Sequence, residues 1–357
     1  MRFIPYLGNK RKLIDPILKA IGQQGKVLDL FSGSGVVSYH LRKRGAVVHA
    51  NDTASYSYHI NKTYLGRIDR SEQFSQYINW LNKFSENPRE RYFSRYYSEN
   101  PDASKERIYY TARNGAFIDF ILQQVWARTW IQKIFEHSNT WESPVLCDLL
   151  YQMCTHANTS GVFKSWHKKF AGEKRFEGVH KRVHKSNLKR ITTPIKLEVP
   201  TIPEGPEGQA FQYDAIEFFD RVDDEYDAIY IDPPYNTHQY SANYHLLEQA
   251  CRPFERRYIP TDDQVSGIQP DLYKSPYCSK KKFHKTFVAL FDKIKDRTNR
   301  LVVSYNSKGF LGQQEIKNLL GERFNEVSVQ EIDYFNYRGG RAAKEPVKEL
   351  LFIAENS

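Results

Sequence analysis

The feature that most constrains the fold is a glycine-rich turn placed between an apolar segment and a helical one. Residues 27–31 form an apolar run of the length expected of a buried parallel strand. Residues 32–35 (Ser-Gly-Ser-Gly) form the turn, and residues 36–44 have the apolar spacing of a helix. Residues 47–51 form a second apolar run, which ends at Asp52. The pattern predicts a strand–helix–strand unit and therefore an α/β fold with a parallel sheet.

The same strand pattern returns in the last third of the chain. Residues 226–232 have the pattern of a buried strand that runs into Pro233 and Pro234. The later predicted elements are a helix at residues 284–296 and strands at residues 301–305, 327–337 and 347–354. The two ends of the chain are therefore expected to contribute to one sheet.

Residues 61–205 have a different composition. Tyr, Trp, Asn and Arg are frequent, strand signals are weak, and residues 117–135 have helical spacing. Four prolines between residues 194 and 206 indicate a linker at the end of this segment. We therefore predict one discontinuous α/β domain, formed by residues 1–60 and 206–357, with a mostly helical insertion formed by residues 61–205.

Positive charge is concentrated in one part of the insertion. The formal net charge of the chain is +10, which favours a polyanionic partner. Residues 161–200 hold eleven Lys and Arg against three Glu, with aromatic residues interleaved. A solvated basic face is the alternative interpretation, but the aromatic residues favour contact with nucleic acid. The candidate DNA-contacting residues are Lys168, Lys169, Lys181 and Arg182, with Arg338 and Arg341 in a second, acid-free loop.

The sequence also bears on compartment and metal content. No segment approaches the roughly 18 consecutive apolar residues of a membrane span. The four cysteines form no C-x-x-C pair, which favours a reducing cytoplasm over a disulfide framework. His180 and His184 have helical spacing and share the insertion with Cys147 and Cys154, but the gap between the cysteines is wrong for a zinc finger. We expect a cytoplasmic protein without a membrane contact or a metal ion.

The glycine turn and Asp52 are candidates for a nucleoside site. Glycines let the backbone approach a ligand, and the following helix N-terminus offers N–H groups. Alone, the turn is also compatible with any α/β protein. A dinucleotide fingerprint would place Gly or Ala where this sequence has Ser38, which disfavours an oxidoreductase. Asp52 follows the second strand, where an acid binds ribose hydroxyls or caps the next helix.

Asp232-Pro233-Pro234-Tyr235 is the most specific motif of the chain. It lies at the predicted carboxyl end of a parallel strand, where open α/β sheets bind their ligands. Two consecutive prolines stiffen the backbone and remove two N–H donors, which leaves carbonyl acceptors beside a carboxylate and an aromatic ring. A proline-rich turn is the alternative, but the motif follows the glycine loop and Asp52 in the order of a ligand-binding domain. We therefore interpret the motif as catalytic.

In combination, these motifs resemble the D12 class of adenine-N6 DNA methyltransferases, the group that includes the Dam-type enzymes. That family has an N-terminal Gly-Lys segment, an F-x-G-x-G loop, a target-recognition insertion and then D-P-P-Y. The corresponding segments here are residues 6–13, 31–35, 61–205 and 232–235. The resemblance implies a Rossmann-like, S-adenosylmethionine-dependent methyltransferase sheet with an inserted, mostly helical DNA-recognition domain.

The resemblance implies a role for each matching residue. Tyr6 and Lys10 would lie beside S-adenosylmethionine near its methionine end, and Asp52 would hold the ribose hydroxyls. Tyr6 stands where the Dam-type enzymes carry a tryptophan, a change that keeps an aromatic ring for stacking. Asp214 would accept a hydrogen bond from the amine of the cofactor adenine. The rest of the cofactor pocket would be lined by Asp29, Phe31, Gly33 and Gly35.

The implied reaction gives a physical reason for the catalytic motif. An exocyclic adenine amine is a poor nucleophile because its lone pair is delocalised into the ring. Acceptors at the Asp232 carboxylate and the Pro233 carbonyl would bind both amine hydrogens and favour a tetrahedral nitrogen, whose lone pair attacks the sulfonium methyl in line. Tyr235 would stack on the target base. The base must leave the duplex, because its amine is inaccessible inside it.

Other functions fit part of this pattern. Cytosine-N4 enzymes usually carry Ser, and many RNA and protein enzymes carry Asn, where this chain has Asp232. An oxidoreductase is disfavoured by Ser38 and by the D-P-P-Y motif, and nothing catalytic is missing, as it would be from a degenerate DNA-binding relative. We therefore expect a monomeric, site-specific adenine-N6 methyltransferase of double-stranded DNA. We place it in a restriction–modification setting, with a cognate restriction endonuclease acting at the same site.

Overall fold

The computed structural model describes residues 2–22, 25–68, 71–83, 88–89, 91–100, 104–126, 138–167, 185–334, 337–338, 341–342 and 347–356. The chain divides into two compact units. The helical unit consists of Met1–Gly8, Arg67–Thr201 and Tyr240–Tyr273, and the sheet unit consists of Asn9–Gly66, Ile202–Gln239 and Lys274–Ser357. The assignment of catalytic and recognition roles to separate segments stays a prediction.

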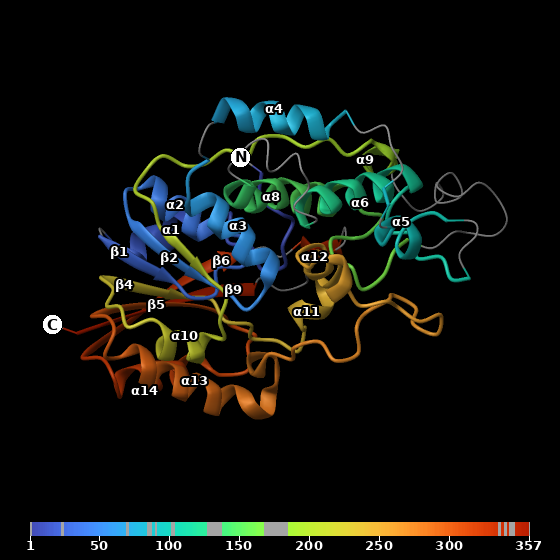
Figure 1. Ribbon diagram of the computed structural model, residues 1–357. Helices are drawn as coiled ribbons and strands as arrows, with labels where there is room; N and C mark the ends of the chain where they lie inside the picture. The colour runs from blue at the N-terminus through green and yellow to red at the C-terminus, as the bar shows by residue number, and fades with distance from the viewer. Residues whose placement is uncertain are drawn as a thin grey trace. The chain divides into compact units, whose positions relative to one another are not determined.

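The sheet unit is built on one mixed sheet. In its described part, seven strands lie in the order β3-β2-β1-β4-β5-β9-β6 (Figure 1). The strands from β3 to β5 are parallel to their neighbours, whereas β9 runs antiparallel to β5 and β6. The strands are β1 Lys26–Asp29, β2 Val47–Asn51, β3 Gln209–Phe211, β4 Ala228–Ile231, β5 Arg300–Asn306, β6 Glu326–Tyr334 and β9 Val347–Glu355. This arrangement confirms the predicted α/β class.

Helices cover both faces of this sheet. In Figure 1, α1, α2 and α3 lie on one side of the strands, and α10, α13 and α14 lie on the other. Their bounds are α1 Ile14–Ile21, α2 Val36–Lys43, α3 Ser55–Leu65, α10 Ala215–Arg221, α13 Lys280–Ile294 and α14 Gln313–Gly321, with a short 3-10 helix at Pro276–Cys278. A sheet covered on both faces explains why the strand sequences are continuous apolar runs.

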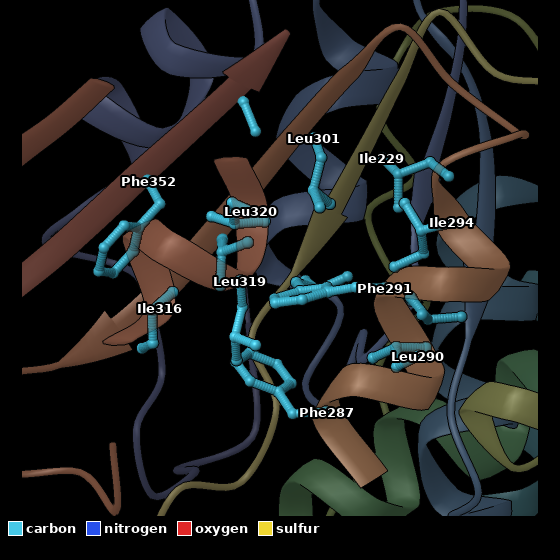
Figure 2. Close-up of a cluster of buried hydrophobic side chains, with 14 of the residues drawn as sticks. Ile229, Phe287, Leu290, Phe291, Ile294, Leu301, Ile316, Leu319, Leu320 and Phe352 are labelled. Carbon is cyan, nitrogen blue, oxygen red and sulfur yellow. The ribbon is translucent and has the colours of Figure 1, made fainter. Parts of the chain in front are cut away.

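Alternate residues of the central strands enter two separate cores. Ile229 and Leu301 belong to the core under α10, α13 and α14, whereas Tyr230 and Val302 belong to the core under α1 and α2. Figure 2 shows the first of these cores, in which side chains of α13 such as Phe291 gather with residues of the strands. Burial of each such side chain stabilises the fold by about 1.5–3 kcal/mol. The carboxyl ends of the strands are thereby held on a rigid support.

The helical unit is rich in buried aromatic residues. Its elements are α4 Ser71–Leu81, α5 Phe93–Tyr96, α6 Ala112–Trp126, α8 Ser138–His156, α9 Lys185–Thr192, α11 Tyr240–Asn243, α12 His245–Ala250 and a 3-10 helix at Phe254–Arg256. The buried Arg107 donates to the carbonyls of Thr261 and Gln264, which ties the later segment to the rest of the unit. Within the described residues, no helix is long and apolar enough to cross a membrane.

Most of the predicted elements are confirmed, with shifted ends. The glycine turn leads from β1 to α2 and β2, and the predicted strands at residues 226–232 and 301–305 are β4 and β5. The helix expected at residues 117–135 begins earlier, at Ala112, and its last part lies outside the described residues. Two elements differ from expectation: the three-residue β3 is too short to stand out in the sequence, and the polar loop near residue 340 contains a ribbon of β7 Tyr337–Arg338 and β8 Arg341–Ala342.

Gly35 is the glycine that the turn most requires. Its φ is 73°, and a Cβ there would meet Tyr64 Cδ2 at 3.0 Å and Asn61 Oδ1 at 3.1 Å. We expect Gly35→Ala to lower the free energy of unfolding by about 1–3 kcal/mol, because alanine resists a left-handed backbone. Gly321→Ala is the control: this residue lies in α14 with nothing within 4 Å of its Cβ, so helix propensity should raise stability by about 0.5–1 kcal/mol. Urea denaturation measures the free energy of unfolding of both variants. Equal changes in the two variants would contradict the requirement for glycine at residue 35.

Candidate active site

The carboxyl ends of β1 and β4 define the candidate active site. The strand order reverses between them, because β2 and β3 continue the sheet on one side and β5 on the other. Open α/β sheets bind ligands at such a reversal. Asp29 is the last residue of β1 and pairs in register with Tyr230, and Asp232 directly follows β4. Parallel pairing therefore brings two aspartates that are distant in sequence to the same edge.

The glycine loop after β1 is held by polar side chains. Gly33 and Gly35 have φ of 48° and 73°. The Ser57 hydroxyl donates to the Gly33 carbonyl at 2.7 Å, and the Asn61 amide donates to the Ser32 hydroxyl at 3.0 Å. Gly35 is the N-cap of α2 and has no side chain to bind the first N–H groups of that helix. Ser57 and Asn61 thus hold the loop in place by hydrogen bonds. Because the glycines lack side chains, the loop backbone can approach a ligand closely.

Asp52 closes the other side of this loop. Its Oδ2 accepts from the Gly33 N–H at 2.9 Å, and its Oδ1 accepts from the Ala54 N–H at 2.9 Å. Burial raises the pKa of the carboxyl, and the two backbone N–H groups oppose that shift. Asp52 therefore turns the chain into α3, although the N-cap itself is Ala54. The alternative prediction that Asp52 caps the next helix is therefore wrong, because Ala54 occupies the N-cap position; a role in ligand binding stays a prediction.

Asp29 is a buried carboxyl with an unusual proton affinity. Burial raises its pKa to about 7, and the negative charges of Asp232 and Asp52 add to the rise. The Ser38 hydroxyl donates to Asp29 Oδ2 at 2.7 Å and opposes the rise. Ser38 thus supports the end of β1 at the position where a dinucleotide fingerprint would have glycine or alanine. Near neutral pH, this carboxyl can gain or lose a proton in response to a nearby charge.

Asp232 is paired with a buried lysine. The Lys10 ammonium lies 2.9 Å from Asp232 Oδ1 and 2.9 Å from Glu349 Oε1. Burial raises the pKa of Asp232, and Lys10 opposes that rise. Burial alone would lower the pKa of Lys10, but the two carboxylates outweigh it and raise that pKa above its usual value. Lys10 therefore stays charged, which favours an ionised, hydrogen-bond-accepting Asp232.

The rest of the D-P-P-Y motif lies in an irregular segment after β4. Pro233 is buried, while Pro234 and Tyr235 are half-buried. The Tyr235 ring makes an edge contact with Tyr305 of β5, with centroids 5.3 Å apart, and the Lys10 ammonium lies 5.9 Å from its centre. The motif therefore presents a carboxylate, a donor-free backbone and a ring at one place.

Two further predicted residues of the sheet unit have defined contacts. The Phe31 ring makes an edge contact with Tyr277, with centroids 5.2 Å apart. Asp214 is the N-cap of α10 and accepts from the Ile216 N–H at 2.9 Å. The backbone of the preceding Tyr213 is bound on both its N–H and its carbonyl by the Asn51 side chain. Asn51 thus links the end of β2 to the segment that carries Asp214.

Tyr6 belongs to the helical unit. Its ring stacks on Tyr244 with centroids 4.8 Å apart and lies 5.3 Å from Tyr240. The Leu7 N–H donates to the Tyr244 hydroxyl at 2.8 Å. His245 is buried in the same unit, where its Nε2 lies 3.0 Å from the Phe163 carbonyl. Except for Tyr6, all the predicted catalytic and cofactor residues therefore lie within the sheet unit.

Most of the residues considered as DNA contacts or metal ligands belong to segments outside the described residues. Lys168, Lys169, Lys181 and Arg182 lie outside the described residues, as do His180 and His184. Arg338 and Arg341 are paired in register across β7 and β8. The four cysteines are free and buried, and the described part of the chain contains no cluster of three potential metal ligands.

Sequence reasoning missed the residues that support the motifs. Ser38 was noted only as a mismatch to a dinucleotide fingerprint, Asn51 only as the end of a strand, and Glu349 only as a charge at the edge of an apolar run. The available signal in the sequence was an acid directly beside the apolar strand segment at residues 350–354. In the structure Glu349 is 2% exposed, which is rare for an acid without a partner. Together, the acceptors and loop N–H groups at this edge suit a ligand that carries hydroxyl donors and positive charge. The Asp232 motif adds acceptors for a second, hydrogen-bond-donating group.

Comparison with known proteins agrees with this chemistry. The model of the D12 class N6 adenine-specific DNA methyltransferases matches residues 6–308. The Type II methyltransferase M.NlaIII of Neisseria lactamica is 28% identical over 99% of each chain, and M.CviAII of Paramecium bursaria Chlorella virus 1 is 27% identical over 99% of each. The Type II methyltransferase M.FokI of Planomicrobium okeanokoites is 30% identical over 90% of this chain and 46% of that protein.

The family model spans both the glycine loop and the D-P-P-Y motif, the two segments that the sheet brings together. Its description specifies DNA, adenine and N6, which decides against the cytosine, RNA and oxidoreductase alternatives. The chain therefore belongs to the D12 class of N6 adenine-specific DNA methyltransferases, and it is an adenine-specific DNA methyltransferase that uses S-adenosylmethionine.

Proposed function

We propose that Asp232 binds the reacting amine of an adenine that has been flipped out of double-stranded DNA. The observation that carries the proposal is the Lys10–Asp232 ion pair at the reversal point of the sheet, directly before two prolines. An ionised carboxylate at this edge accepts a hydrogen bond from one N–H of the amine, and the Pro233 carbonyl accepts a hydrogen bond from the other, while both hydrogens stay on the nitrogen. The nitrogen lone pair is then no longer committed to the ring, and the amine becomes a better nucleophile.

Tyr235 and the base-flipping step complete the substrate site. Tyr235 stacks on the extruded base, and its edge contact with Tyr305 fixes the ring that the base meets. Extrusion costs a few kcal/mol of stacking and pairing energy, which the stacking on Tyr235 offsets in part. Positioning and electrostatics, without a strong base, account for the acceleration in this scheme.

The residues of the sheet unit fit S-adenosylmethionine. Asp52 holds the ribose hydroxyls, Asp214 accepts from the adenine amine, and the loop with Gly33 and Gly35 lies against the nucleoside. Asp29 and Lys10 face the methionine end, and Phe31 contributes an apolar contact. The role of Tyr6 beside the cofactor is carried over from the resemblance to the family. The chemistry of the donor set supports this fit, because several carboxyls at one edge suit a ligand with hydroxyls and a cationic sulfonium. When bound, the cofactor supplies an electrophilic methyl group.

DNA is held by basic residues outside the catalytic motif. Lys168, Lys169, Lys181 and Arg182 contact phosphates from the recognition insertion at residues 61–205, and Arg338 and Arg341 contact them from the β7–β8 ribbon. The chain works as a cytoplasmic monomer; its free, buried cysteines suit a reducing compartment. Because several relatives are Type II methyltransferases, we place the chain in a restriction–modification setting, with a cognate endonuclease that acts on the same site.

Variants of the motif test the proposed roles. Asp232→Ala should lower the single-turnover rate of methylation by at least ~10²-fold, because one preorganised acceptor is lost. Asp232→Asn should also be damaging, since an amide is a weaker acceptor, whereas Tyr235→Phe should be mild and Tyr235→Ala severe. In Asp232→Ala the Lys10 ammonium keeps Glu349 as a partner, so the fold should persist. Asp220→Ala, at an exposed ion pair, is the control; wild-type rates in Asp232→Ala would refute the assignment.

The raised carboxyl pKa values predict a pH dependence of cofactor binding. Asp29, whose pKa is about 7, and Asp232 gain negative charge as the pH rises from 5.5 to 8. S-adenosylhomocysteine is the matched control ligand, because it lacks only the sulfonium methyl and its charge. The preference for S-adenosylmethionine over S-adenosylhomocysteine should increase by at least ~3-fold over this range, as a nearby carboxylate ionises. Calorimetry measures both affinities, and a ratio that is constant with pH would place the sulfonium away from these carboxyls.

A further inference from the structure

Glu349 is a buried acid that the proposed reaction does not use directly. Its side chain is 3% exposed, and that of Lys10 is 6% exposed. Burial of an unneutralised carboxylate costs several kcal/mol, and one Lys10 charge faces two carboxylates here, Asp232 and Glu349. A neutral or apolar residue on β9 would avoid that cost. The acid at this position therefore calls for a specific contact, which Lys10 provides.

The position of the Lys10 ammonium depends on its partners, because the side chain that carries it is long and flexible. The lysine lies in an irregular segment before α1, and its side chain has a flexible four-carbon stem. One ion pair with Asp232 would leave the ammonium free to swing about that carboxylate. The second ion pair, at 2.9 Å to Glu349 Oε1, fixes the ammonium between two points.

Glu349, in contrast, lies on a rigid support. It is paired in register with Asn306 of β5 and with Ile332 of β6, so its backbone is held on both sides. The fully buried Ser304 donates from its hydroxyl to Glu349 Oε1 at 2.6 Å. The sheet therefore fixes Glu349, Glu349 fixes the Lys10 ammonium, and the ammonium contacts Asp232.

We propose that Glu349 is a positioning residue for methyl transfer: it holds the Lys10 ammonium on Asp232 Oδ1 and leaves Oδ2 for the target amine. The inference rests on the proposed function, because it needs Asp232 at the reacting amine. Ser304 supports Glu349 in the same chain of contacts. The groups that face this network from other elements are Asp29, Tyr230 and Tyr235.

The test compares single-turnover rates of the full chain on unmethylated genomic DNA with saturating S-adenosylmethionine. Glu349→Gln keeps the shape of the side chain but not its charge, and should lower the rate about tenfold or more, as misplacement of a reacting group does. The melting temperature should stay close to wild type. Ser304→Ala should give a smaller loss. Glu331→Gln, at the exposed Lys348 pair on the same sheet, is the control and should not change the rate.

Two readouts separate positioning from a merely structural role. Because Glu349 acts through Lys10, the double variant Lys10→Met/Glu349→Gln should be no slower than Lys10→Met alone. The acid limb of the pH–rate profile should move to higher pH in Lys10→Met, because Lys10 opposes the rise in the pKa of Asp232. In the double variant the acid limb should return toward lower pH, because the Glu349 charge raises the pKa of Asp232 and is absent there.

A wild-type rate in Glu349→Gln, or losses that multiply in the double variant, would overturn the positioning role. Loss of activity in Asp232→Ala together with either result would refute only this inference. Wild-type activity in Asp232→Ala would instead refute the proposed function on which it rests.

Discussion

The ion pair between Lys10 and Asp232 is the interaction on which the candidate site depends. A carboxylate buried at the edge of a sheet tends to take up a proton, and a protonated Asp232 would lose acceptor capacity. The Lys10 ammonium, at 2.9 Å, opposes that tendency. The pair costs desolvation energy that an apolar pair would not require, which points to a functional role for this edge of the sheet.

The sheet determines where this charge can act. Parallel pairing of β1 with β2 and β4 brings Asp29, Asp52 and Asp232 to one edge, where burial and the charges of the other two raise the pKa of Asp29. Helices pack on both faces of the strands, so the edge is the place where the sheet can meet a ligand. The polar contacts of Ser57 and Asn61 then fix the glycine loop without occupying its outer side. Neighbouring carboxyl groups at this edge can thus bind both a cationic nucleoside and an amine.

The sequence predicted the parts of this site that local patterns encode. Two parts were predictable: the strand–turn–helix at residues 27–44 and the strand before Asp232. Both depend on the spacing of apolar residues and on glycine or proline, which determine the backbone conformation within a few residues. Glu349 was not predictable, because its role depends on antiparallel pairing with a strand that precedes it by more than forty residues. Ser38 counted only as a mismatch to another fingerprint, whereas in the structure it supports Asp29. Asp214 was predicted as a ligand residue, and its contact as the cap of α10 emerges only from the fold.

The most direct test of the account identifies the methylated base. Unmethylated duplex DNA is incubated with the chain and S-adenosylmethionine, digested to nucleosides and analysed by mass spectrometry. The account predicts N6-methyladenine as the product, and no product above background when Asp232 is replaced by alanine. N4-methylcytosine, or N6-methyladenine formed at an undiminished rate by the Asp232→Ala variant, would contradict it.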